Sequence, residues 1–262
     1  MIFSPCSRLW ISILSNFIAN WTAPPHVRAL TTTRSIGVSD TPFHHNNIAL
    51  HVGDNEAHVL TNRASLIQSL ELLNEPIWLE QTHSTRCIVV EDSLERSADA
   101  SITRCHNVPL SIMTADCVPI VLCNRAGTEI AAIHAGWKGL VNGIVENTLA
   151  KMNNPADTLI AWIGPSICQS CYAVGSEMKN TYIQRYPFTE NTFQTDKSQI
   201  FANLPKMAEL ILKNQGVSEV FQSGACTYEL KNEFYSYRRQ AQTGRMVTLI
   251  WMNPLNVFNT GL

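Results

Sequence analysis

Charged residues are scarce in this chain of 262 residues, where Asp, Glu, Lys and Arg together make up 15%. The formal net charge is −2, and no run of Lys or Arg occurs. A basic surface is the usual footprint of nucleic-acid binding, and a basic run is typical of membrane-surface binding. We therefore expect neither nucleic acid nor a membrane as a partner. The hydrophobic content of 45% is sufficient for a sizeable core.

A hydrophobic run of membrane-spanning length is also missing. Residues 9–19 are largely apolar but too short to cross a bilayer, and polar residues interrupt them. No small-x-small cleavage site follows before Trp21, so the stretch does not fit a signal peptide. We predict that it packs on the core as a leading strand or helix, and that the protein is cytoplasmic.

The eight cysteines lack the close spacing of a small secreted disulfide scaffold, so we expect reduced thiols. Cys168 and Cys171 form a C-x-x-C motif. A structural zinc would normally use a second Cys/His pair at short spacing, and the sequence shows none. The motif follows Gly164-Pro165-Ser166, which favours a loop over the strand-to-helix position of a redox motif. These two cysteines are therefore expected to be structural or incidental.

A cluster of histidines suited to several copper ions is missing as well. The chain has eight histidines and no His-x-His pair. Multicopper centres use many imidazoles, which argues against a copper oxidase. His44, His45 and His51 lie close in sequence, but adjacent side chains of an extended segment point apart. His51 is open to either substrate contact or backbone capping.

Internal repeats, low-complexity tracts and flexible linkers are absent, which predicts one domain over residues 1–262. Short β-branched runs alternate with helical periodicity, and this mixture predicts an α+β fold of mixed β-sheets layered with helices. The predicted strands are 27–33, 87–90, 108–113, 118–122, 129–134, 158–163, 217–221 and 247–251. The predicted helices are 140–152, one from Gly175 or Ser176 to about Arg185, and 204–214. A further helix is predicted to be capped by Asp54 or Asn55, with Val59, Leu60, Ala64, Ile67 and Leu70 on its apolar face. Residues 189–198 are predicted to be a loop.

The stretch from 113 to 152 contains the most chemistry. Cys117 lies between two predicted strands, and His134 ends a third, with Gly136 and Gly139 permitting a sharp turn after it. His83 lies between two further apolar runs. Three ligands of this kind leave a fourth tetrahedral position for water, which is the pattern of a catalytic zinc. The alternative is that these buried Cys and His residues make ordinary core contacts.

More than one function is open for several neighbouring polar residues. Asp116 adjoins Cys117 and could act as a general base, although an extended backbone would turn it away from a metal and leave it to orient an imidazole. Arg63 lies on or near the inner helix face, as an ordinary surface arginine or as an anion-binding residue. The arginines at 238, 239 and 245 fit a solvated loop, a phosphate site or a dimer contact.

Eight short motifs occur in one order: Q-T-H-S, A-D-A-S-I-T, T-A-D-C-V-P, H-A-G-W-K-G, W-I-G-P-S-I, C-Y-A-V-G, S-Y-R-R and T-G-R-M. From about Trp21 to Trp251 the chain resembles the laccase-domain family of purine nucleoside phosphorylases. That family was formerly called polyphenol oxidase and includes a bacterial peptidoglycan editing factor. The resemblance implies zinc on His83, Cys117 and His134, which match the family ligands in Q-T-H-S, T-A-D-C and H-A-G-W. The family usually has two glycines where this chain has Ile36-Gly37.

The resemblance implies phosphorolysis of adenosine, inosine, guanosine or methylthioadenosine, with inorganic phosphate as second substrate and possible deamination of adenosine. Arg34 and Arg63 are the candidates for phosphate binding. One rival hypothesis is a metal-free cysteine hydrolase, with Cys117 as nucleophile and a histidine as its base, acting for example on a peptidoglycan precursor. Another is a binding protein without catalysis. The oligomeric state and preferred nucleoside remain open.

Overall fold

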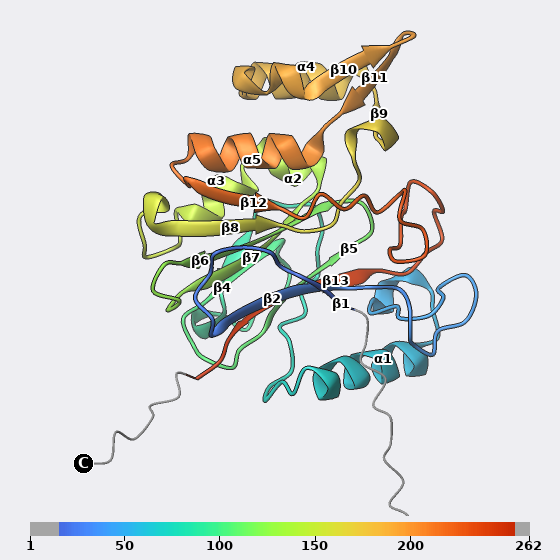
Figure 1. The fold of residues 1–262 in the computed structure, drawn as a ribbon, viewed down its shortest axis with the longest axis vertical. Helices are drawn as coiled ribbons and strands as arrows, with labels where there is room; N and C mark the ends of the chain where they lie inside the picture. Colours follow the sequence, from blue (N-terminus) through green and yellow to red (C-terminus); the bar gives the residue numbers. More distant parts are fainter. Residues whose placement is uncertain (1–15, 255–262) are drawn as a thin grey trace, which may run out of the picture.

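The computed structural model describes residues 16–254, which form one α+β domain with two β-sheets stacked between helices (Figure 1). The larger sheet has the order β12-β8-β6-β7-β4-β3 and the smaller one β1-β2-β13-β5. The larger sheet comprises β12 (Glu219–Gln222), β8 (Leu159–Ile163), β6 (Val118–Asn124), β7 (Ile130–Ala135), β4 (Ala100–Thr103) and β3 (Cys87–Val89). The smaller comprises β1 (Asn16–Ile18), β2 (Val27–Thr32), β13 (Met246–Met252) and β5 (Leu110–Thr114).

The central strands are buried on both faces, which explains why they read as continuous apolar runs. In β6, Ile120 and Leu122 pack against the helical side, while Val121 and Cys123 face the smaller sheet. This alternation is the two-residue period of a strand. One hydrophobic core therefore lies between the larger sheet and its helices, and a second lies between the sheets.

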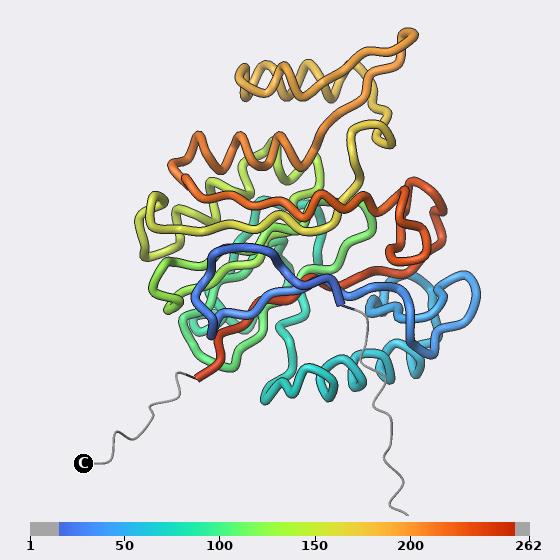
Figure 2. The backbone as a smooth tube through the Cα atoms, in the orientation of Figure 1, coloured from blue at the N-terminus to red at the C-terminus, as the bar shows by residue number. Residues whose placement is uncertain are grey.

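The helices cover the two outer faces. The larger sheet packs on α2 (Trp137–Asn142), α3 (Ile144–Leu149) and α5 (Leu204–Asn214), and the smaller sheet packs on α1 (Glu56–Ser69). A third sheet of β9 (Ala173–Val174), β10 (Phe193–Asp196) and β11 (Gln199–Ala202) lies with α4 (Ser176–Arg185) beyond α5, as the trace also shows (Figure 2). Helices α4 and α5 have the predicted bounds.

Three local predictions were wrong. The helix predicted over 140–152 is two short helices, because Gly143 at φ +102° ends α2. Residues 189–198 contain a 3-10 helix and β10 rather than a loop, because β10 pairs with β11. Helix α1 buries Val59, Asn62, Arg63 and Leu66, whereas Leu60 and Ala64 of the predicted face are exposed.

The buried polar face of α1 has a structural reason. Asn62 donates hydrogen bonds to the carbonyls of His45 and Asn47, and Arg63 donates from Nε to the carbonyl of Ile48 at 2.9 Å. The helix therefore binds the irregular backbone before it through polar side chains, which a search for apolar periodicity does not detect. Asn55 caps it by accepting from the Ala57 amide, as one of the two predicted caps.

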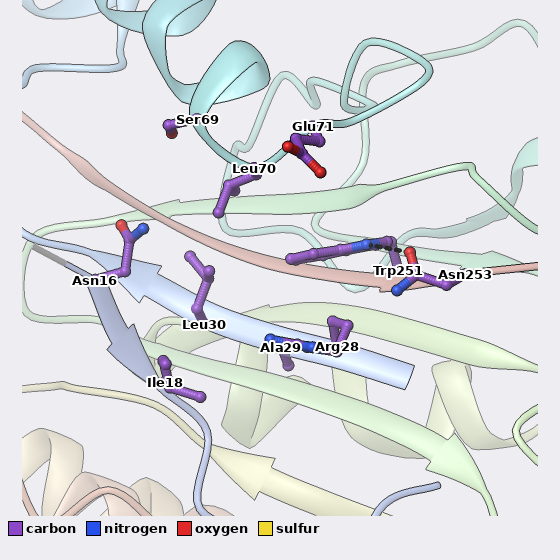
Figure 3. A pocket seen from close by; sticks show the side chains of 10 residues that line it. All are labelled: Asn16, Ile18, Arg28, Ala29, Leu30, Ser69, Leu70, Glu71, Trp251 and Asn253. Carbon is purple, nitrogen blue, oxygen red and sulfur yellow. Dashed lines mark hydrogen bonds between the residues drawn. The ribbon is translucent and has the colours of Figure 1, made fainter. Parts of the chain in front are cut away.

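The leading segment forms a strand where it is described: β1 pairs with β2, and residues 9–15 of that prediction lie outside the described residues. Within residues 16–254, no helix has the length and apolar character needed to cross a bilayer. A cavity of about 620 Å³ lies between the end of α1 and the smaller sheet (Figure 3). Its lining includes Arg28, Leu70 and Trp251 but none of the predicted site residues.

Candidate active site

Three predicted ligands converge at one end of the larger sheet. Cys117 immediately precedes β6, and His134 lies in β7 opposite Pro119, so strand pairing brings the two together. The Nε2 atom of His83 lies 3.7 Å from the Cys117 sulfur, and the rings of His83 and His134 are 4.8 Å apart between centroids. One potential ligand atom from each residue lies within 4.8 Å of the others. His134 is buried, Cys117 is half-buried and His83 is exposed, so the group faces outward.

Asp99, which the sequence analysis did not select, holds this group in place. Its fully buried carboxylate accepts a 2.7 Å hydrogen bond from Nδ1 of His134. Since Nδ1 is engaged, Nε2 is the nitrogen that His134 can offer to a metal. A carboxylate that fixes the tautomer of a ligand histidine is a common feature of zinc sites. The only available signal was the position of Asp99 in A-D-A-S-I-T, just before β4.

The same carboxylate also fixes the loop that carries His83. It accepts from the backbone amides of Thr82, His83 and Ser84 and from the Ser84 hydroxyl. These bonds hold His83 at φ +61°, in the left-handed region. Burial alone would raise the pKa of Asp99, but the hydrogen bonds from His134 and Ser84 outweigh it and lower the pKa to about 2. Asp99 is therefore an anion that connects two of the three potential ligands.

The metal-free electrostatics favour a thiolate. Burial opposes ionisation of Cys117, but His134 and His83 overcome it and lower its pKa to about 6. Burial likewise disfavours the charged form of His134, while Cys117 and Asp99 raise its pKa to about 9. A thiolate beside an imidazolium is the resulting state at neutral pH.

Gly136 allows the three side chains to approach one another. A Cβ at this position would lie 2.5 Å from Cδ2 and 2.9 Å from Nε2 of His83, and 3.3 Å from the Cys117 sulfur. Any side chain here would displace His83. One soft sulfur and two imidazoles are a donor set that could hold a zinc ion through three protein ligands.

The group opens into a cavity of about 460 Å³, a typical size for a small-molecule site. Aromatic residues Trp137, Tyr172 and Tyr237 line it, as do His51, Arg238 and Arg245. Burial and the nearby Cys117 raise the pKa of Tyr172 to about 12, which keeps its hydroxyl neutral. The cavity therefore combines flat aromatic surfaces, positive charge and the His₂Cys group.

Asp116 lines the cavity, but the structure orients it differently from what was considered from the sequence. Its φ of +97° is not the extended conformation assumed there. The carboxylate accepts hydrogen bonds from the Thr227 and Ser236 hydroxyls and from the Arg238 amide. It thus binds the segment 227–238 to the strand end that carries Cys117, while Asp99 orients the imidazole.

The structure brings neither Arg34 nor Arg63 to the cavity lining. Arg34 donates from Nε to the His44 carbonyl and from NH1 to the Lys231 carbonyl. Arg63 is buried and stacks on Trp78 at 3.9 Å in addition to its bond to Ile48. Both arginines thus support loops, so the sequence-based assignment of phosphate binding to them is not favoured by their position.

The arginines that line the cavity come from the C-terminal segment. Arg245 donates from NH1 to the carbonyls of Thr243 and Gly244, and Arg238 donates to the Ala173 carbonyl and lies over the Tyr172 ring at 4.9 Å. From sequence alone, both arginines fit a solvated loop, a phosphate site or a dimer contact. Sequence alone did not locate Arg238 and Arg245 at the cavity, because they lie more than 100 residues after Cys117 and His134 in the chain.

The chain is similar to a known family and to several named proteins. The family model described as multi-copper polyphenol oxidoreductase laccase matches residues 28–253. A protein named purine nucleoside phosphorylase from Pseudomonas aeruginosa is 38% identical over 89% of this chain and 96% of its own length. Purine nucleoside phosphorylase YfiH of Escherichia coli is 36% identical over 90% of this chain and 98% of its own.

Solved structures share the fold. A Neisseria meningitidis protein superposes with a TM-score of 0.87 and 38% identity, covering 91% of this chain and 99% of its own. YlmD from Geobacillus stearothermophilus has a TM-score of 0.79 and 26% identity, covering 92% and 99%. The chain therefore belongs to the laccase-like family whose curated members compared above carry the name purine nucleoside phosphorylase.

Proposed function

We propose that this protein is a zinc-containing purine nucleoside phosphorylase acting on adenosine, inosine, guanosine or methylthioadenosine. The observation that carries the proposal is one cavity in which the His₂Cys group, three aromatic side chains and two arginines face the same space. The names of the relatives support the same reaction class.

The aromatic residues suit the flat purine. Tyr172 and Trp137 are half-buried, and Tyr237 is exposed at the mouth. A ring stacked on aromatic side chains gains both apolar burial and favourable quadrupole interactions. These residues therefore provide the base-binding surface in this proposal.

The arginines suit the second substrate, inorganic phosphate. Charge-assisted bonds from a guanidinium to phosphate are short, strong and directional. In phosphorolysis a phosphate oxygen bonds to C1′ of the sugar, the C1′–N9 bond breaks, and its electron pair and then a proton go to the base. Arg245, fixed through its own loop carbonyls, holds phosphate beside the sugar, and Arg238, which lies over the Tyr172 ring, adds a second positive charge to the cavity.

His83, Cys117 and His134 would hold the zinc ion, with Asp99 keeping Nδ1 of His134 engaged. When bound, zinc supplies Lewis acidity and lowers the pKa of the water that completes its coordination. This chemistry extends the proposal to deamination of adenosine to inosine as a second activity. The aromatic walls orient C6 of the purine toward the ligands for that reaction.

The test is to incubate inosine with the enzyme, with and without phosphate, and to identify the sugar product by NMR. We expect hypoxanthine release to require phosphate and to yield ribose 1-phosphate. Equal cleavage without phosphate, or free ribose as the product, would refute the phosphorylase assignment.

A cysteine hydrolase is the second candidate, and one observation favours it: the Cys117 sulfur lies 3.7 Å from Nε2 of His83 and close to His134. Against the effect of burial, the two histidines lower the pKa of Cys117 to about 6. Thiolate attack at neutral pH follows from that environment. Iodoacetamide distinguishes the two functions. A hydrolase without metal is alkylated at Cys117 regardless of chelation, whereas zinc ligation protects the sulfur until a chelator removes the ion.

Polyphenol oxidation, which the description of the matched family model suggests, is not proposed for this chain. All eight histidines lie within residues 16–254, and the two groups of side chains there that could hold a metal contain only His83 and His134 between them. A multicopper centre uses many more imidazoles.

A further inference from the structure

A second group of potential metal ligands lies outside the active site. Cys168 is the N-cap of a short 3-10 helix and Cys171 is its last residue, while Cys226 and Glu229 belong to the segment after β12. Their ligand atoms all lie within 4.8 Å of one another. The Cys171 sulfur is 3.7 Å from Oε1 of Glu229. The sequence has no second Cys/His pair at short spacing, but the fold places Cys226 and Glu229, more than 50 residues away, beside the C-x-x-C motif.

Backbone pairing brings the two segments together. Ser166 and Cys226 form a parallel bridge, with Ser166 donating to the Ala225 carbonyl and Thr227 donating to the Ser166 carbonyl. Each ligand pair also spans one turn. The Cys171 amide donates to the Cys168 carbonyl, and the Leu230 amide donates to the Cys226 carbonyl. Residues spaced by three on such turns project to the same side.

The surroundings of Cys226 resemble those of a ligating sulfur. Its sulfur accepts a 3.3 Å hydrogen bond from the Cys168 amide, and the amides of Tyr228 and Glu229 are also directed at it. Amide donors favour negative charge on sulfur. Without a cation, however, burial and the neighbouring thiols raise the pKa of both Cys171 and Cys226. A divalent ion that replaces the thiol protons would offset the repulsion between three neighbouring thiolates.

We propose that Cys168, Cys171, Cys226 and Glu229 bind a second zinc ion in a closed, structural site. Zinc–sulfur bonds of about 2.3 Å in a tetrahedron place neighbouring sulfurs about 3.8 Å apart. Ligand atoms within 4.8 Å need only a small contraction to reach that geometry. Four protein ligands leave no position for water, in contrast to the three-ligand group in the cavity.

The position of this site gives the ion a structural task. The C-x-x-C turn leads directly into Tyr172, and the other segment continues through Thr227 to Arg238. Thr227 donates to Asp116, next to Cys117. An ion that joins the two segments therefore holds both the aromatic wall and the basic wall of the cavity.

Zinc content measured by mass spectrometry on untagged full-length protein tests the proposal. We expect two zinc ions per chain in the wild type and one in Cys168→Ser/Cys171→Ser. The matched control is Cys105→Ser, which removes an exposed cysteine outside both groups and should retain two. If the double variant binds as much zinc as the wild type, or if the control loses an ion too, the second site is refuted.

Two further measurements cover the alternatives. Glu229→Gln alters an exposed residue and keeps all thiols, so it remains informative if the double variant fails to fold. We expect its second zinc to pass to a competing chelator at least tenfold more readily than in the wild type, and an unchanged exchange would count against the site. Titration of denatured, unreduced protein should find eight thiols, whereas two fewer would identify a disulfide in place of the metal.

Discussion

Asp99 accepts five hydrogen bonds, from three consecutive amides, one hydroxyl and the imidazole of His134. Asp99 positions His83 and His134, because it binds the loop that carries the first and the imidazole of the second. Partners of this kind typically change metal affinity by about 10–100-fold when they are replaced.

We therefore predict that Asp99→Asn lowers zinc affinity at the His83–Cys117–His134 group by about 10–100-fold. The amide keeps the shape but removes the charge that favours the ligand form of His134. Chelator competition measures the effect, and Asp40→Asn, at a side chain that is 89% exposed, is the matched control. An affinity equal to that of the wild type would show that Asp99 only supports the loop.

Arg245→Ala tests the residue assigned to phosphate. A hydrogen bond to a charged group contributes about 1.5–3 kcal/mol, which corresponds to roughly 10–150-fold in the apparent KM for phosphate. Deamination of adenosine, which consumes no phosphate, should change much less. Arg28→Ala, at an exposed arginine outside this cavity, is the control. A phosphate KM that does not rise would remove Arg245 from the proposal.

Ile36 occupies a position where the related family usually has glycine. Its φ is +60°, a conformation that costs a β-branched residue about 1–2 kcal/mol, and its side chain is 45% exposed. Ile36→Gly should therefore stabilise the protein by roughly 0.5–1 kcal/mol after the greater flexibility of unfolded glycine is subtracted. Val38→Gly, at an exposed residue of the same loop without positive φ, should destabilise it. Thermal unfolding would contradict this if both variants lowered Tm.

At the scale of elements, the site depends on where β7 stops and α2 starts. Gly136 is the N-cap of α2, and its backbone lies against His83 and Cys117. Helix α2 can begin at Trp137, so close to His134, because its N-cap Gly136 has no side chain.

Gly136→Ala should accordingly displace His83 and remove most zinc and turnover while the protein stays folded. The added methyl would lie 2.5 Å from Cδ2 of His83, well inside contact distance. Gly175→Ala is the matched control, since Gly175 also precedes a helix and has open space around it. Full zinc occupancy in Gly136→Ala would show that the site tolerates the methyl group.

Strands and helices with a clear period were predictable from sequence. Strand β6 has β-branched residues buried on both faces, and α5 has a strong apolar face after the cap at Asn203. The buried face of α1 was predicted wrongly because Asn62 and Arg63 are buried and donate hydrogen bonds to backbone carbonyls. Local propensity contains no information about such long-range partners.

At the scale of the whole molecule, the grouping of His83, Cys117 and His134 was predictable because their motifs are short and ordered along the chain. The cavity walls were not, since Tyr172, Arg238 and Arg245 reach the site only through tertiary packing. Asp99 illustrates the limit: its motif was noticed, but only the fold shows its carboxylate beneath both His83 and His134. Cys226 and Glu229 beside the C-x-x-C turn are a second example.

The layered fold concentrates this chemistry where several segments end together. Two strand ends, a loop and the C-terminal segment meet at one cavity, and its lining residues Trp137 and Tyr172 pack against the core of the larger sheet. Replacing Cys117, which belongs to neither core, should therefore affect the site without unfolding the protein.

The most direct test compares wild type and Cys117→Ala, purified without a histidine tag, for zinc content and for phosphate-dependent cleavage of inosine. We predict that the variant remains folded, contains one zinc ion fewer per chain and loses nearly all turnover. The predicted loss of one zinc ion relative to the wild type is the same whether or not the second group also binds zinc. Equal zinc content in the two proteins, or undiminished cleavage by the variant, would contradict the account.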